Sequence, residues 1–403
     1  MFIKINSRNI IVNKECMNFK ISKVEKLLCL CLRHCDFLEK EKIKKLYFEI
    51  GDGAVYTAAK LNQVQSIVAH ALIVTLSKNE LPLHWSEEYQ KTEKKIISYM
   101  DELNKVANLL AKQNIPLLAL KNSGITLGMY PYYGACPMGD VDVLVRKSQF
   151  REAHQILVKH GYQFKFRSEL EEDSIQAAEQ SGGAEYLVQL NNEEKLWFEL
   201  QWRPIAGRWI QPDQEPRADE LVDRSISIKG SNVRLLSPED NLLQVSLHTA
   251  KHTFVRSPGF RLHTDVDRII SIQKINWKLF EKMVLKLKTK TAVYISLSMA
   301  VNLLGTNIPN ETLKNIQPNK LKIKIMQKWL MRVGIFEPDG HKWSKIGYII
   351  FVSLLYDTWR DFFSGIFPSS TYMKSQYSYS SDLLTPYYHI KRLLNLIFKR
   401  ANL

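Results

Sequence analysis

The sequence predicts an α+β protein, with a small mixed β-sheet core flanked by helical N-terminal and C-terminal parts. Apolar residues recur at helical spacing before about residue 95 and again after about residue 230. Between these limits, short apolar or alternating runs are typical of buried strands. A chain of 403 residues also exceeds the usual size of one domain. We therefore expect four segments: a flexible basic arm at 1–20, a helical N-terminal region at 21–95, an α/β core at 96–230 and a helical C-terminal region at 231–403.

Composition indicates a folded globular protein with anionic partners. Apolar residues make up 45% and aromatic residues 10% of the sequence, which argues against disorder. The formal net charge of +15 favours nucleotides, nucleic acid or an acidic membrane surface. The five cysteines show no disulfide spacing, no signal-type apolar run follows residue 1, and the longest apolar stretch, 346–355, is too short to span a bilayer. We expect a cytoplasmic protein without a transmembrane segment.

The two helical parts are predicted from apolar spacing and from caps. Helical spacing begins near Lys23 and continues, with breaks, to about Gln113. In the C-terminal part, Ser237 is placed as an N-cap, with Pro238 at the first helical position and Asp240 at the third. A helix is therefore predicted to begin at Pro238.

The core is predicted to alternate short strands with helices. The run from Asp140 to Val145 first alternates and then becomes apolar, which suits a central strand. Residues 191–194 are polar and separate two later strand-like runs, which predicts a hairpin. The predicted strands are 115–121, 140–145, 186–190 and 196–202, and the predicted helices are 125–130 and 147–161.

Asp140 and Asp142 are candidate metal ligands. At positions i and i+2 of one strand, both carboxylates project from the same face of the sheet. A divalent cation between them relieves their repulsion, and Mg²⁺ prefers hard oxygen ligands of this kind. Glu199 is the only acid in the run 196–202 and is the best candidate for a third carboxylate of a two-metal site. Aspartates at strand ends also act as caps or face solvent, so the pair alone does not decide between the two interpretations.

A turn of small residues precedes this strand. Lys121, Asn122, Ser123 and Gly124 follow the first predicted strand and lead into a short predicted helix. Backbone amides at a helix start are able to face a phosphate group. The turn is therefore a candidate phosphate-binding element.

Several segments carry a family resemblance: Ile115–Leu127, Tyr130-Pro131, Cys136–Val145, the Gly161-Tyr162 step and Trp197–Trp202. They resemble the bacterial family of uncharacterised nucleotidyltransferases, in the polymerase-beta-like nucleotidyltransferase superfamily. The likeness covers roughly residues 90–305. It implies a nucleotidyltransferase core at 96–230 that moves a nucleoside monophosphate from a nucleoside triphosphate to an unknown acceptor and releases pyrophosphate.

The resemblance also implies roles for individual residues. Asp140 and Asp142 would bind Mg²⁺ or Mn²⁺, and Glu199 would be a third ligand or the general base. The positions that would contact the nucleotide are Lys121, Asn122, Ser123, Gly124, Gly139 and Lys251. The acceptor would be a small molecule, a protein or RNA.

Three positions depart from the pattern of the family. Asn122 stands where glycine is usual, Cys136 where arginine is common, and Gln201 where histidine is common. None of these changes removes a carboxylate, so transfer remains the favoured interpretation. The alternatives are a catalytically degenerate nucleotide-binding or interaction protein, which the substitutions at Asn122 and Cys136 favour, and a glycosyltransferase whose Asp-x-Asp pair holds a sugar nucleotide.

His248 and His252 share a predicted helix face at a spacing that zinc ligands also use. Thr249 stands where the metalloprotease pattern requires glutamate, which argues against zinc. Packing, a polar network and nucleotide contact together with Lys251 are the remaining interpretations. Asp265 would orient one of the histidines or join a helix-packing network.

Cys29, Cys31, His34 and Cys35 crowd into one predicted helix. Their spacing fits no common zinc pattern, so we interpret the thiols as buried on an amphipathic helix. Basic clusters at 320–332 and 391–400 are interpreted as solvated helix faces. The apolar residues at 393–398 would also allow peripheral contact with an acidic membrane surface, and an RNA acceptor would explain the charge equally well.

Overall fold

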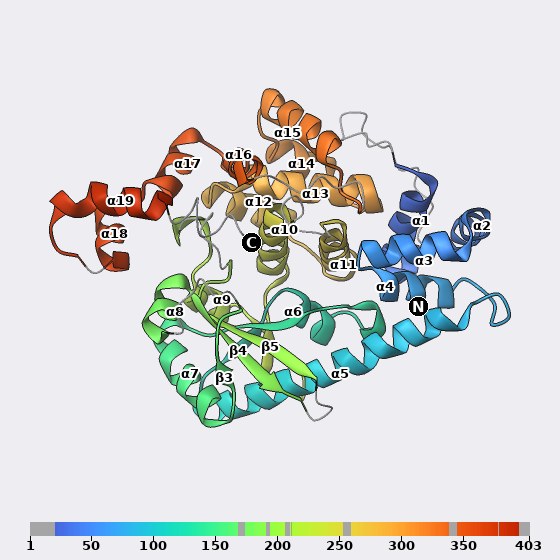
Figure 1. The fold of residues 1–403 in the computed structure, drawn as a ribbon, viewed down its shortest axis with the longest axis horizontal. Coiled ribbons are helices and arrows are strands. Elements are labelled where there is room, and N and C mark those ends of the chain that lie inside the picture. Colours follow the sequence, from blue (N-terminus) through green and yellow to red (C-terminus); the bar gives the residue numbers. More distant parts are fainter. Residues whose placement is uncertain are drawn as a thin grey trace.

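A computed structural model describes residues 21–167, 174–190, 194–205, 210, 212–252, 259–337, 345–377 and 379–394 (Figure 1). The helices α5 and α7 cover one face of a mixed β-sheet, and the remaining long helices lie on the other side of the sheet. The predicted basic arm at 1–20 lies outside the described residues. The predicted α+β class is confirmed.

The described helices and strands follow in chain order. The N-terminal helices are α1 (Lys23–Cys31), α2 (Lys40–Ile50), α3 (Asp52–Leu61), α4 (Gln65–Ile73) and α5 (Leu83–Ala111). The core contains β1 (Leu117–Ala119), α6 (Lys121–Gly128), β2 (Asp140–Leu144), α7 (Phe150–Lys159), β3 (Gln163–Phe164), α8 (Ile175–Ser181), β4 (Gly183–Gln189), β5 (Lys195–Gln201), α9 (Ala218–Asp223), β6 (Ile226–Ser227) and β7 (Val233–Leu235). The C-terminal helices are α10 (Pro238–His252), α11 (His263–Ile272), α12 (Trp277–Lys286), α13 (Lys290–Leu304), α14 (Asn310–Asn315), α15 (Lys320–Val333), α16 (Lys345–Leu355), α17 (Trp359–Ile366), α18 (Ser370–Tyr377) and α19 (Thr385–Leu394).

The sheet has the strand order β3-β4-β5-β2-β1-β7-β6. Strands β2 and β5 are parallel neighbours, β1 pairs antiparallel with β2, and β7 pairs parallel with β1. The β4–β5 pair is antiparallel, as the predicted hairpin requires, although residues 191–193 lie outside the described part. The central strand of the sheet is therefore β2, between β5 and β1, and the predicted carboxylates lie on β2 and β5.

Alternation along β2 and β5 gives the sheet two different faces. Val141, Val143 and Phe198 point into a buried cluster that includes apolar side chains of α5 and α7. Leu118 and Leu144 lie on the opposite face and pack in a second, smaller cluster with residues of α9. Because Asp140 and Asp142 alternate with Val141 and Val143, the strands direct their carboxylates away from the α5–α7 layer.

The helices on the other side of the sheet share one large apolar core. This cluster joins residues of α1 and α4, such as Leu28 and Leu72, to residues of α10 and α13, such as Leu242 and Ile295. Figure 1 shows the N-terminal helices beside α11 and α13 although they are far apart in sequence. The helix α1 begins with a capping box in which Ser22 and Glu25 bond reciprocally.

Most element boundaries differ by a few residues from the predicted ones, and two of the differences affect the site and the sheet. The helix α6 begins at Lys121 rather than at 125, so the candidate phosphate turn is the first turn of a helix. The sheet extends to β7, beyond the boundary at 230, because a three-residue strand pairs with the distant β1. The helix predicted from Pro238 is confirmed as α10, with Ser237 Oγ accepting from the Asp240 backbone N–H at 3.3 Å.

The apolar stretch at 346–355 forms α16, and within the described residues no helix combines the length and hydropathy that a bilayer span needs. Farther along, the amphipathic α17 and α19 expose large apolar side chains. Among them are Trp359, Phe363, Phe367, Tyr387, Ile390 and Leu394. Residues 395–403 lie outside the described part, and contact with an acidic membrane surface stays a prediction.

A buried ion pair fixes the chain that leaves β5. Arg203 Nε contacts Glu215 Oε1, and both side chains are almost fully buried. The other oxygen of Glu215 accepts from the backbone N–H of Ile205 at 3.1 Å, and Arg203 also donates to the carbonyl of Ile210 at 3.3 Å. Burial raises the pKa of Glu215 to about 7 despite the opposing charge of Arg203.

Candidate active site

Three carboxylates meet at the centre of the sheet. Asp140 and Asp142 lie on β2, and Glu199 lies directly opposite Asp142 on β5. One side-chain oxygen from each residue lies within 4.8 Å of the other two. The exposed fraction of the side chain is 28% for Asp140, 5% for Asp142 and 15% for Glu199. The structure therefore brings together the three acids that the sequence singled out.

Lys121 and Gln201 hold two of these carboxylates together. Lys121 Nζ lies 2.5 Å from Asp142 Oδ1 and 3.8 Å from Glu199 Oε2. Gln201 Nε2 donates to the same two groups, at 3.0 Å to Asp142 Oδ1 and 2.9 Å to Glu199 Oε2. Each carboxylate is thus oriented by one cation and one amide.

Arg167 binds the outer side of the cluster. One terminal nitrogen lies 2.7 Å from Asp140 Oδ2, and the other contacts Glu199 Oε1. Its Nε and its backbone N–H both donate to Glu185 Oε2 on β4, at 3.2 and 2.7 Å. The guanidinium therefore connects two of the three candidate ligands to a fourth carboxylate.

Arg167 is not among the site residues predicted from the sequence. A weak signal was available, because Tyr162, Phe164 and Phe166 alternate and pack against the apolar face of the sheet. Arg167 follows this alternation on the opposite side, where the carboxylates lie. The two-residue strand β3 is too short to be predicted from local pattern alone.

The start of α6 is fixed by close contacts. Lys121 has a positive φ of 49°, and its backbone N–H donates to Gln244 Oε1 of α10 at 3.2 Å. At Gly124 a Cβ atom would lie 2.9 Å from the carbonyl oxygen of Ala119, so glycine is needed where the helix turns back on β1. The Lys121 ammonium is consequently delivered to the carboxylates from a rigid turn.

Ser123 connects the same turn to β2. Its Oγ accepts from the backbone N–H of Asp142 at 2.9 Å, so this hydroxyl positions the strand that carries the two candidate aspartates. The amides of Asn122 and Ser123 belong to the first turn of α6, where helix geometry leaves N–H groups without an intrahelical acceptor. These amides, rather than the serine hydroxyl, are the candidate phosphate donors.

Gly139 and Lys251 lie in different settings. Gly139 directly precedes Asp140 and is exposed, and a Cβ atom there would meet nothing within 4 Å. The space beside the first aspartate is therefore open. Lys251 lies in the last turn of α10, three residues after His248, and its charge acts on that histidine. Nucleotide contact by either residue stays a prediction.

His248 is partly buried near the site and is neutral there. Burial and then the positive charge of Lys121 hold its pKa well below 6.5. The rings of His248 and His252 lie 4.5 Å apart between centroids. Across the described ranges no cysteine, carboxylate or further histidine completes a metal-ligand cluster with this pair. The geometry favours packing beside Lys121 over a zinc site.

Comparison with known proteins gives one result. The family model described as uncharacterised nucleotidyltransferase matches residues 49–305, well over half of the 403-residue chain. The chain belongs to this family. No curated protein and no solved structure matches it. For this nucleotidyltransferase family member, the general reaction class is therefore established by family, whereas the donor, the acceptor and the metal requirement are not.

The asparagine that departs from the family pattern has a structural partner. With its amide nitrogen facing Asp265, Asn122 donates to the two carboxylate oxygens at 2.7 and 3.1 Å. Asp265 is buried in α11, where burial raises its pKa and Arg261 and Arg268 oppose the shift. Asp265 therefore joins a helix-packing network that connects α6 to α11. This is the second of the two interpretations given above for Asp265.

Cys136 stands at a position where the family commonly has arginine. In this chain an arginine from a distant helix binds the loop that contains Cys136. Arg268 of α11 lies 3.5 Å from Cys136 Sγ, donates to the carbonyl of Ala135 at 2.5 Å and stacks on Tyr130 at 4.3 Å. Cys136 is buried, so its thiol is not directed at a substrate. The third departure, Gln201, replaces a histidine and hydrogen-bonds two carboxylates, as described above.

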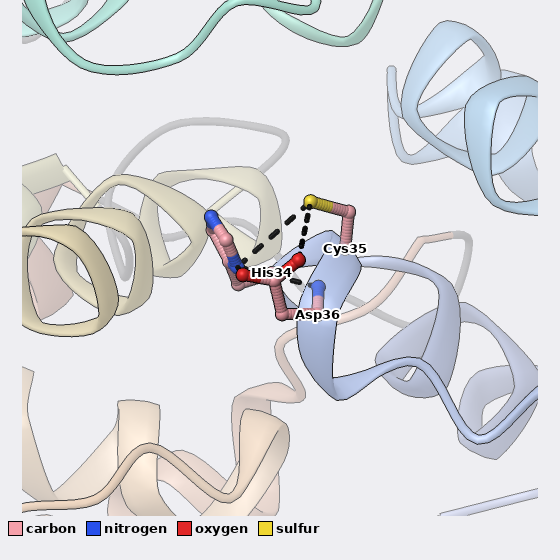
Figure 2. Close-up of side chains that lie close together, drawn as sticks. All are labelled: His34, Cys35 and Asp36. Atoms are coloured by element: carbon pink, nitrogen blue, oxygen red, sulfur yellow. Dashed lines mark hydrogen bonds and ion pairs between the residues drawn. The ribbon is translucent and has the colours of Figure 1, made fainter. Parts of the chain in front are cut away.

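The prediction of buried thiols on one helix is confirmed for Cys29 and Cys31 but is wrong for Cys35, which lies beyond the end of α1 in a 3₁₀ turn and is only partly buried. Cys29 and Cys31 are buried in α1, and burial raises the pKa of both thiols, to about 12 for Cys29. Figure 2 shows that His34, Cys35 and Asp36 direct donor atoms toward one another at the end of this helix. The imidazole Nδ1 accepts from the Asp36 backbone N–H at 3.4 Å, so it caps the following 3₁₀ turn.

Proposed function

We propose that this chain is a metal-dependent nucleotidyltransferase that moves a nucleoside monophosphate from a nucleoside triphosphate to an acceptor hydroxyl or phosphate and releases pyrophosphate. The observation that carries the proposal is the convergence of Asp140, Asp142 and Glu199 within 4.8 Å on the parallel strands β2 and β5. Membership of the nucleotidyltransferase family supports the reaction class. The acceptor is a small molecule, a protein or RNA.

The donor set suits a hard divalent cation. All three donors are carboxylate oxygens, which Mg²⁺ and Mn²⁺ prefer. Four carboxylates are joined by ion pairs to only two cations, which leaves a formal charge of −2. The groups are Asp140, Asp142, Glu185, Glu199, Lys121 and Arg167. Bound by Asp140, Asp142 and Glu199, the cation would balance this charge and supply Lewis-acid activation of the reacting phosphate.

The residues of the chain itself would bind and orient the substrates. The amides of Asn122 and Ser123 would receive phosphate oxygens at the positive end of α6. Lys121 would add a positive charge beside them. Glu199, as third ligand or general base, would accept the proton of the acceptor hydroxyl before an in-line attack on the α-phosphate.

Triphosphate with Mg²⁺ is expected to raise the thermal stability of the wild-type protein, because a ligand that binds only the folded state stabilises it. At about a hundred times the dissociation constant the gain is roughly 2.7 kcal/mol. Thermal unfolding with each of the four ribonucleoside triphosphates measures this gain and identifies the preferred base. Asp140→Ala/Asp142→Ala should lose it.

The matched control is Asp219→Ala/Asp223→Ala. These carboxylates lie on the exposed side of α9 and contact Arg146 rather than the site, so the control should keep the stabilisation. The absence of any shift in the wild type would overturn the triphosphate as donor, and sugar nucleotides would be tested next. Stabilisation without pyrophosphate release would support the degenerate, nucleotide-binding alternative.

A further inference from the structure

Arg167 competes for the oxygen atoms that the proposed metal site uses. Its terminal nitrogens lie on Asp140 Oδ2 and Glu199 Oε1, which belong to two of the three candidate ligands. An arginine side chain stays protonated at any physiological pH, so deprotonation cannot remove the competition. A divalent cation beside the same oxygens would repel the guanidinium. Metal binding and the position of Arg167 are therefore coupled.

The inner part of Arg167 is held independently of the metal ligands. Its backbone N–H and its Nε both bond to Glu185 Oε2, and its guanidinium lies 5.6 Å from the centre of the Trp197 ring. Glu185 is on β4, one strand away from the triad. When the terminal nitrogens leave Asp140 and Glu199, these contacts keep the guanidinium at the edge of the site. It is then a preorganised donor for an anionic group.

We propose that Arg167 is a phosphate-binding residue that alternates between the metal-ligand carboxylates and the triphosphate of the nucleotide. With neither ion nor nucleotide bound, it neutralises Asp140 and Glu199. With both bound, its two terminal nitrogens bind phosphate oxygens, a geometry for which the planar guanidinium is suited. This inference rests on the proposed function. It adds to the site a residue that is not one of the three candidate metal ligands.

This exchange predicts effects of opposite sign for one substitution. Arg167→Gln removes the competing charge, so the affinity for Mn²⁺ without nucleotide should rise by roughly threefold to tenfold. The same variant lacks the phosphate donor, so the affinity for the triphosphate in saturating Mg²⁺ should fall by about ten- to a hundredfold, the usual range for a charged hydrogen bond. A residue with a purely structural role would weaken both or neither.

Two further variants test whether the charge or the geometry of the Arg167 side chain matters and whether the effects are specific to this site. Arg167→Lys retains a positive charge but not the fork of donors, so Mn²⁺ affinity should stay close to that of the wild type while triphosphate affinity falls. Arg151→Gln is the matched control, because Arg151 is exposed on α7 and pairs with Glu179 outside the site. It should change neither affinity.

The experiment measures bound Mn²⁺ by electron paramagnetic resonance and triphosphate binding by calorimetry, on the full chain with folding checked by circular dichroism. Opposite shifts in Arg167→Gln support the proposal. Unchanged Mn²⁺ affinity in Arg167→Gln, or weaker binding of both Mn²⁺ and triphosphate, overturns the proposal. The proposed function still stands in that case if the wild type binds both Mn²⁺ and triphosphate. A wild type that binds neither Mn²⁺ nor any triphosphate overturns the proposed function and this inference with it.

Discussion

Replacing Asp142 with alanine is expected to lower nucleotidyl transfer by roughly a hundred- to a thousandfold. A metal ion contributes several kcal/mol of charge stabilisation to such a transition state, and about 1.4 kcal/mol corresponds to each factor of ten. Asp142 is the most buried of the three acids and shares Oδ1 with Lys121 and Gln201, so no neighbouring carboxylate takes its place. Pyrophosphate release from the preferred triphosphate, measured with Mg²⁺, gives the rate.

Asp142→Asn provides the closest comparison, because it preserves the shape of the side chain and removes its charge. Both variants should keep the circular dichroism spectrum of the wild type and lose Mn²⁺ binding. Asp223→Ala, in the exposed part of α9, should retain full activity. Undiminished transfer by a folded Asp142→Ala protein would eliminate the assignment of β2 as the metal-binding strand.

Removal of Arg203 is expected to destabilise the protein by about 2 kcal/mol at pH 8.5. Its buried partner Glu215 would have to stay protonated about 1.5 pH units above its wild-type pKa of about 7, at about 1.4 kcal/mol per unit. The raised pKa of Glu215, about 7 against 4.5, sets the pH dependence. A carboxyl group whose pKa is raised by folding contributes stability that is fully present below 4.5 and is lost as the pH rises through the folded value. Without Arg203 the folded pKa rises further, so this loss extends to higher pH.

Urea unfolding of Arg203→Met at pH 5.5 and pH 8.5 measures the effect. The difference from the wild type should be small at pH 5.5, where Glu215 is mostly protonated in both proteins, and large at pH 8.5. Arg203→Met/Glu215→Gln is the control, because glutamine keeps an acceptor for the Ile205 backbone N–H without a charge. It should recover most of the stability and abolish the difference between the two pH values. Equal destabilisation of the single variant at both pH values would contradict the argument.

The parts of the fold that local patterns determine were predictable. The central strand β2, the hairpin strands β4 and β5, and the start of α10 follow from alternation and cap residues within a few positions. The same patterns placed Asp140 and Asp142 on one face. Glu199 was found because an acid in an apolar strand is costly unless it has a partner. The partners of Glu199 in the structure are the cations Lys121 and Arg167.

Other features depend on contacts between distant residues and had no local signal. The strand β7 is three residues long and forms because β1 offers a free edge more than a hundred positions earlier. The amide of Asn122 finds its acceptor in Asp265, and the guanidinium that supports the Cys136 loop comes from α11. The carboxylates bound by Arg167 come from three strands. Such pairs cannot be recognised from short segments of a single sequence.

The shared apolar core of the helices affects the order in which the chain becomes stable during synthesis. Leu72 of α4 packs in the same cluster as Leu242 of α10, about 170 residues later. At 5–20 residues per second a ribosome needs roughly 10–30 s to make the intervening chain. All strands of the sheet precede α10 in the chain, whereas α1 and α4 at that stage still lack the part of their core that α10 and α13 supply. The first helices of the nascent polypeptide therefore present apolar surface to chaperones for that interval, although they are the earliest part to be translated.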